Sequence, residues 1–278
     1  MAAKKQTLFR SQTLADAGYA SRSPKALSGP VEVVQRIGAM GVLLGRTVAC
    51  MATARVDKRE SWRMAHRFTN ESVTFVVVAM SFVGMIMVYQ STMQLTRAVG
   101  DTHLVGASFL KLLIRVLGPT VVGLLVACRV GAGIAAEIGA MAVTDQLDAM
   151  RMCAADPIEA LMVPRLRGGL VAGVALAVIG SGASMLAGLL TGMAVFAMSP
   201  GTYWNFDLIG ISDLVQGLAK ALVYGAAVPI IAGACGLHAR GGARGVGQAT
   251  TDAVVGSSVA IVVLDSVISL VSYVAAGT

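Results

Sequence analysis

Long stretches without any charged residue constrain the fold of this chain most strongly. No Asp, Glu, Lys or Arg occurs in residues 72–96 or in residues 168–206. A transmembrane helix needs about 20 consecutive apolar residues, because the hydrocarbon core of a bilayer is about 30 Å thick. The apolar runs are continuous and do not alternate with polar residues, which argues against a transmembrane β-barrel. The sequence therefore predicts an all-α, polytopic membrane helical bundle.

The composition favours the same class of protein. Of the 278 residues, 56% are hydrophobic and 13% are charged, whereas soluble domains carry roughly 25% charged residues. The 32 glycines allow transmembrane helices to approach closely. The net charge of +7 comes from Lys and Arg at the ends of apolar runs, as the positive-inside rule requires. The cysteines and histidines form no metal-binding spacing, so we expect no metal site.

The N-terminal part divides into three segments. Residues 1–29 are polar and basic and lack the apolar core of a secretory signal, so we expect a flexible cytoplasmic leader. Residues 30–52 carry apolar residues at helical spacing with two Arg residues off that stripe, which favours an amphipathic helix in the membrane interface. A short first span is the alternative. Lys and Arg are frequent in residues 55–67, which marks the cytoplasmic side, so we assign 30–67 to this interfacial helix and basic linker.

About five transmembrane helices are predicted in the remaining body, residues 68–278. The loops between them alternate between basic and non-basic, which places the N-terminus in the cytoplasm and the C-terminus outside. Gly118 and Pro119 are expected to break or kink the second span. Small-residue spacings in the third span, at 169/173 and 188/192, favour close helix packing. The expected spans begin and end near 72–96, 104–128, 161–198, 214–237 and 250–274.

Several charged residues fall within these spans. Lys111 and Arg115 lie four residues apart on one face of the second span. They either line a cavity that accepts an anionic headgroup or lie near the outer end of the helix and extend to the interface. Lys220 and Asp265 lie within the fourth and fifth spans. A charged group at mid-membrane is costly, so these residues are expected to face protein or water.

The most polar interruption between two apolar regions is the stretch 129–167. Its carboxylates, arginines and amphipathic pattern require it to lie outside the hydrocarbon. Asp156 and Pro157 are typical of a turn followed by a helix start. We interpret this stretch as the cytoplasmic contact through which a separate motor protein moves the membrane helices.

Four motifs carry a resemblance to a known family. They are R-x-LGP at 115–119, CRVGAGIAAEIGAMAVTDQLDAM at 128–150, DPIEALMVPRL at 156–166 and GQATTDAVVGSSVAIVVLD at 247–265. With these motifs the sequence resembles the MlaE (YrbE-type) permease family of ABC lipid transporters over about residues 30–275. One position departs from the family pattern, because Val116 stands where the family commonly has Glu. This change removes a carboxylate from the expected cavity.

The resemblance implies a non-catalytic permease subunit in the bacterial inner membrane. Such a subunit pairs with a second permease subunit, identical or different, and with cytoplasmic ABC ATPase subunits. It passes phospholipid to or from a periplasmic MCE-domain protein, and it needs no cofactor because the ATPase binds ATP. A coupling helix near 134–152 would dock on the ATPase through Glu137, Met141, Thr144, Asp145, Gln146, Asp148 and Arg151. Candidate lipid-binding residues are Tyr89, Gln90, Met93, Arg115, Leu117 and Lys220.

Two other functions compete with this interpretation. No GxxxxGK[ST] phosphate-binding loop occurs in the chain, and no nucleophile–base grouping supports covalent catalysis. A lipid-modifying membrane enzyme would have to use Asp252 or Asp265, without a nucleophile or a metal. An ion- or proton-coupled secondary transporter could use the buried Lys and Asp residues, but no inverted repeat is visible.

Overall fold

The computed structural model describes residue 45 and residues 58–98, 103–153, 156–204 and 209–276. The expected leader, the expected interfacial helix apart from residue 45, and residues 55–57 of the basic linker lie outside the described residues. Residues 58–67 of that linker form the start of a long helix, Lys58–Ala98. Within the described ranges the chain forms helices joined by short turns, with no β-strand. The all-α prediction is therefore confirmed.

Five helical segments are long and apolar enough to cross a membrane, in agreement with the sequence. The first, fourth and fifth are single helices, the third joins a short π-helix (Ile158–Met162) to a long α-helix, and the second is a chain of α- and π-helical pieces. Their bounds are α3 (Lys58–Ala98), then α4 (His103–Leu112), η1 (Leu113–Leu117), α5 (Gly118–Val126), η2 (Ala127–Gly131) and α6 (Ala132–Val143), then α8 (Val163–Phe196), α10 (Ile211–Leu237) and α11 (Gly242–Ala276).

The sequence predicts a break or a kink at Gly118 and Pro119, and the break does not occur. Both Leu117 and Gly118 keep helical backbone angles, and Pro119 sits in the first turn of α5. The Gly118 N–H bonds to the Leu113 carbonyl, five residues back, in the π-helical turn η1. A proline removes a backbone donor and crowds the preceding turn. The wider π-turn in front of Pro119 accommodates it within a continuous helical path.

The helical path of the second span continues past the predicted end near residue 128, to Val143. Ile134 and Ile138 are fully buried, and α6 packs along α10 and α11. Part of the stretch 129–167 therefore continues the helical path of the second span as α6. Its small residues, Gly and Ala, allow this helix to lie close to its neighbours.

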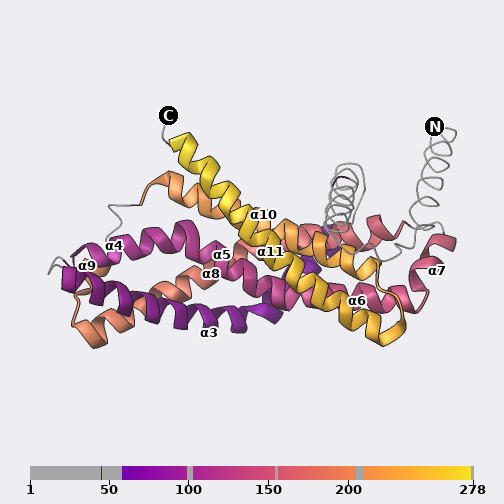
Figure 1. Ribbon diagram of the computed structural model, residues 1–278, viewed down its shortest axis with the longest axis horizontal. Helices are drawn as coiled ribbons and strands as arrows, with labels where there is room; N and C mark the ends of the chain where they lie inside the picture. Colours follow the sequence, from indigo (N-terminus) through magenta and orange to yellow (C-terminus); the bar gives the residue numbers. More distant parts are fainter. Residues whose placement is uncertain (1–44, 46–57, 99–102, 154–155, 205–208, 277–278) are drawn as a thin grey trace, which may run out of the picture. The chain divides into compact units, whose positions relative to one another are not determined.

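The bundle is organised around two packing relationships (Figure 1). Helices α3 and α8 lie side by side along much of their length, and α10 packs against α8, α6 and α11. A Cβ atom on Gly169 would lie 2.5 Å from the Gly225 carbonyl oxygen, and one on Gly173 would lie 2.9 Å from the Gly225 Cα. The α8 and α10 backbones therefore meet at these glycines, which confirms the predicted close packing at 169/173. Gly188 is likewise pressed against Val88 of α3.

The chain traverses the bundle in alternating directions, which defines two ends. The α7 end holds the start of α3, the end of α6, the helix α7 (Gln146–Met152) and the start of α8. The α9 end holds the end of α8, the short helix α9 (Pro200–Tyr203) and the start of α10. The buried Tyr203 fastens α9, because its hydroxyl donates a hydrogen bond to the Met185 carbonyl at 3.1 Å.

Candidate functional site

The connection between the second and third spans contains a sharp turn followed by a short exposed helix. Thr144 ends α6, and its hydroxyl donates to the Ala140 carbonyl at 2.8 Å. Asp145 then adopts the left-handed conformation, with φ 57°, a region that Asp and Asn tolerate better than most residues. This turn separates α6 from α7, so the single helix predicted near 134–152 is two helices.

The side chains of α7 are mostly exposed. Leu147 is the buried anchor, whereas Gln146, Asp148 and Arg151 face outward. Asp148 and Arg151 form an exposed ion pair at 3.1 Å, and such surface pairs contribute little to stability. The apolar Met152 is 89% exposed. These groups are therefore available to a second protein, and Met152 is an exposed residue that the sequence analysis did not select.

The helical segment that leads into α8 begins after Asp156, as predicted. The Asp156 carboxylate accepts a hydrogen bond from the Ile158 N–H at 2.9 Å, which satisfies one of the free donors at a helix start. Pro157 precedes the π-helix η3 (Ile158–Met162), which leads directly into α8. The exposed helix α7 is therefore held between two spans by short connections.

Glu137 differs from the other predicted coupling residues because it lies on α6 and its carboxylate is engaged within the chain. One oxygen contacts Arg67 of α3 at 2.5 Å, and the other contacts Arg165 of α8 at 3.0 Å. Met141, one turn further along α6, is half-buried. The sequence analysis missed Arg67 as a site residue, since nothing in the local pattern shows which distant carboxylate it meets.

The six candidate lipid-binding residues do not form one site. Tyr89 and Gln90 line an apolar groove of about 570 Å³ between α3 and α8, with Met85, Ile86, Leu190, Thr191, Ala194 and Val195. The Tyr89 ring lies 5.7 Å from the ring of Phe196, measured between centroids. Met93 is half-buried further along α3, and Leu117 packs against the core.

Arg115 belongs to a second location, at the α9 end. The nearest Arg115 nitrogen lies 3.6 Å from the Asp213 carboxylate, and Lys111 Nζ lies 3.7 Å from it. Asp213 is in the first turn of α10 and also accepts the Gly210 N–H at 3.1 Å. Because Asp213 lies in the first turn of α10, the two cations lie near the α9 end of the second span.

Lys220 occupies a third location, inside the bundle. Its ammonium lies 2.7 Å from Asp265 of α11 and donates to the Ser269 hydroxyl at 2.9 Å. The same Asp265 oxygen accepts hydrogen bonds from Tyr224 and Thr120, each at 2.8 Å. Two costly intramembrane charges are thereby paired and hydrogen-bonded. Among the described residues, no three His, Cys, Asp or Glu side chains are placed to share a metal ion.

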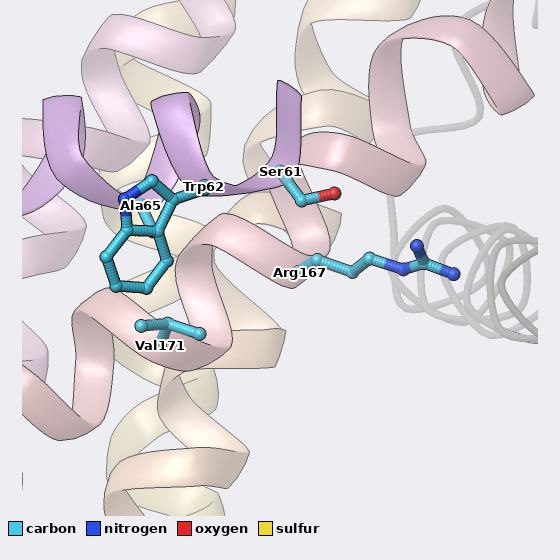
Figure 2. A pocket seen from close by; sticks show the side chains of 5 residues that line it. All are labelled: Ser61, Trp62, Ala65, Arg167 and Val171. Carbon is cyan, nitrogen blue, oxygen red and sulfur yellow. The ribbon is translucent and has the colours of Figure 1, made fainter. Parts of the chain in front are cut away.

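A smaller cavity of about 200 Å³ lies at the α7 end, between the first turns of α3 and α8 (Figure 2). Trp62 and Val171 lie one above the other on its apolar side, and the Arg167 guanidinium points away from them. Ser61 and Ala65 complete the lining. The cavity thus combines a tryptophan ring with a basic side chain, and tryptophan and basic residues are typical of the membrane–water interface.

Comparison with known proteins decides the family. Residues 62–271 match the family model of permease MlaE. The chain belongs to the MlaE permease family. This membership confirms the resemblance carried by the four motifs, and with the five apolar segments it makes the chain a multi-pass membrane protein.

Named relatives agree with the family assignment. A probable ABC transporter permease protein of Synechocystis sp. is 32% identical over 249 residues, covering 87% of this chain and 93% of the relative. The chloroplastic Trigalactosyldiacylglycerol 1 protein of Arabidopsis thaliana is 29% identical, covering 89% of this chain and 71% of the relative. An intermembrane phospholipid transport system permease protein MlaE of Haemophilus influenzae is 29% identical, covering 76% of this chain and 82% of the relative.

Proposed function

We propose that this chain is the membrane-spanning permease subunit of an ABC-type transporter that moves phospholipid between the bacterial inner membrane and a periplasmic MCE-domain protein. Family membership supports the transporter role, and the phospholipid is suggested by the name of the Haemophilus relative. The chain has no phosphate-binding loop, so a separate cytoplasmic ATPase binds and hydrolyses ATP. The chain itself needs no cofactor and catalyses no covalent reaction.

The observation that carries this proposal beyond the family is the exposed helix α7. It presents Asp148, Arg151 and the strongly exposed Met152 at one end of a bundle of apolar helices. A partner can move the bundle through α7 only if it binds one arrangement of the helices better than another. An ATPase whose shape changes with its nucleotide meets this requirement. The α7 end is therefore cytoplasmic, and the C-terminal end of α11 is periplasmic.

Three further features support lipid handling by a pair of permeases. The apolar groove beside Tyr89 and Gln90 suits acyl chains, and the Lys111–Arg115–Asp213 cluster keeps an excess positive charge near the α9 end. Helix α11 is poorly covered by the rest of the described chain, since only 11% of its most apolar 18-residue stretch is buried. A second permease subunit covers part of this face. Val116 leaves neighbouring Arg115 without the carboxylate that family members commonly have at this position.

Reconstitution tests the proposal. The full chain is purified with its cytoplasmic ATPase and MCE partner and placed in vesicles of phosphatidylethanolamine and phosphatidylglycerol with a trace of NBD-labelled phosphatidylethanolamine. We expect transfer of the labelled lipid that depends on ATP hydrolysis. Transfer that runs on a pH gradient without ATP would instead favour the proton-coupled secondary transporter. A tagged chain that recovers neither an ATPase nor an MCE protein would contradict the proposal.

A further inference from the structure

The Glu137 clamp, which we define as Arg67, Glu137 and Arg165, joins three helices at the α7 end. Glu137 of α6 places one carboxylate oxygen 2.5 Å from Arg67 and the other 3.0 Å from Arg165. The Arg165 side chain is 5% exposed, and it also donates to the Leu161 carbonyl of its own segment at 3.0 Å. Its Nε has no hydrogen-bond partner among the described residues. Arg165 therefore depends on Glu137 for its counter-charge.

Helix α6 packs mainly on helices other than α3 and α8, which the Glu137 clamp joins to it. In the described part of the chain, α6 makes extended contacts with α10 and α11, whereas α3 and α8 make their most extensive contacts with each other. The contact between α6 and α10 is close, because a Cβ atom on Gly236 would lie 2.9 Å from the Ile138 Cβ. Packing thus ties α6 to α10 and α11, and α6 reaches α8 by packing through α10. The ion pairs of Glu137 add a direct link from α6 to α8 and α3.

We propose that Glu137 is a positioning residue that transmits displacement of the coupling segment, α6 and α7, to the α3–α8 pair. This inference rests on the proposed function, in which an ATPase moves α7. A displacement of α6 away from α8 would leave the buried Arg165 charge uncompensated, which is strongly unfavourable. Helix α8 therefore follows α6, and α3 follows through both Arg67 and its packing on α8.

This role differs from the contact role that the sequence predicts for Glu137. A docking residue would have its carboxylate free for the ATPase, as Asp148 on α7 has exposed oxygens. Glu137 is 32% exposed, and both of its oxygens already face guanidinium groups. Its neutralisation should therefore leave the ATPase bound while separating ATP hydrolysis from lipid movement.

The test measures lipid transferred per ATP hydrolysed in the complex reconstituted in vesicles of phosphatidylethanolamine and phosphatidylglycerol with NBD-labelled lipid. For Glu137→Gln we expect the ATPase to copurify in normal amount and lipid transferred per ATP to fall about tenfold, as for loss of a typical coupling free energy. Glu60→Gln is the matched control, because it makes the same change in an exposed pair with Arg63 at the same end. This control should behave as the wild type.

Two further variants keep the test decisive if Glu137→Gln accumulates poorly. Arg67→Gln removes the link to α3 but keeps the buried pair with Arg165, so it should fold and lose part of the coupling. The double reversal Glu137→Arg with Arg165→Glu restores one opposite-charge pair and should recover coupling that each single reversal loses.

The outcomes separate this inference from the proposed function. If Arg67→Gln and Glu137→Gln both transferred as much lipid per ATP as the wild type, the inference about Glu137 would be overturned. The proposed function would still stand. Loss of the ATPase from a folded Glu137→Gln chain would overturn the inference as well, since Glu137 would then be a docking residue. A wild-type complex that transfers no lipid would be the failure of the proposed function itself.

Discussion

Lys220 and Asp265 meet inside the bundle, where the Lys220 ammonium lies 2.7 Å from one Asp265 oxygen. Lys220 is completely buried. They come from α10 and α11, and Tyr224 and Thr120 donate hydrogen bonds to the same oxygen. The pair explains how two charged residues within apolar spans are tolerated, because each supplies the counter-charge of the other. It also fastens α11, which is otherwise the least covered of the five spans.

We expect Asp265→Asn to destabilise the folded protein. The substitution leaves a buried ammonium without a counter-charge, and breaking a buried ion pair from one side costs about 3–5 kcal/mol. The measurement is the unfolding midpoint of the purified chain in detergent micelles. The double variant Lys220→Met with Asp265→Leu should recover much of the loss, because it removes both charges together. A midpoint for Asp265→Asn equal to that of the wild type would contradict this account.

Substitution of Gly169 should separate α8 from α10. Its Cβ atom would lie 2.5 Å from the Gly225 carbonyl oxygen, and overpacking of this kind typically costs about 1–3 kcal/mol. We expect Gly169→Ala to lower the unfolding midpoint. Gly182 is the matched control on the same helix, because a Cβ atom there meets nothing within 4 Å. Gly182→Ala should leave the unfolding midpoint unchanged or raise it slightly. An equal decrease of the midpoint in both variants would argue against the close contact of α8 and α10 at Gly169.

Charge reversal on α7 should release the ATPase without unfolding the chain. Asp148 is exposed and its ion pair with Arg151 is on the surface, so Asp148→Arg should change stability by no more than about 0.5 kcal/mol. We expect the ATPase to be lost from the purified complex, and Asp148→Asn to have a smaller effect because it removes the charge without reversing it. Retention of the ATPase by a chain with Asp148→Arg would remove α7 from the docking surface.

The orientation of the bundle can be read from two cysteine positions. Cys153 is exposed directly after α7, and Gly201 of α9 is exposed with open space around it. With the other cysteines replaced by Ser, Gly201→Cys should react with a membrane-impermeant maleimide in intact spheroplasts. A chain that keeps only Cys153 should react after the membrane is permeabilised. The reverse pattern would place α7 in the periplasm and contradict docking to a cytoplasmic ATPase.

Sequence patterns predicted the features that depend on a short stretch of chain, but not those that depend on contacts between helices. The glycines at 169/173 and the helix start after Asp156 were predicted correctly, because each depends on a short stretch of chain. The helix does not break at Pro119, and the helical path of the second span continues past residue 128 to Val143. A π-turn and the packing of α6 on α10 and α11 decided both, and neither is visible in hydropathy.

The sequence by itself determined that the chain crosses a membrane about five times and carries an ionic segment between its second and third spans. These properties follow from the lengths of the apolar runs, since insertion depends on local hydrophobicity. The tertiary structure decided which charges meet. Glu137 pairs with Arg165, 28 positions away, and Lys220 donates to Ser269, 49 positions away. Such pairs depend on how the helices rotate and cross, and close packing of small residues from distant parts of the chain sets both.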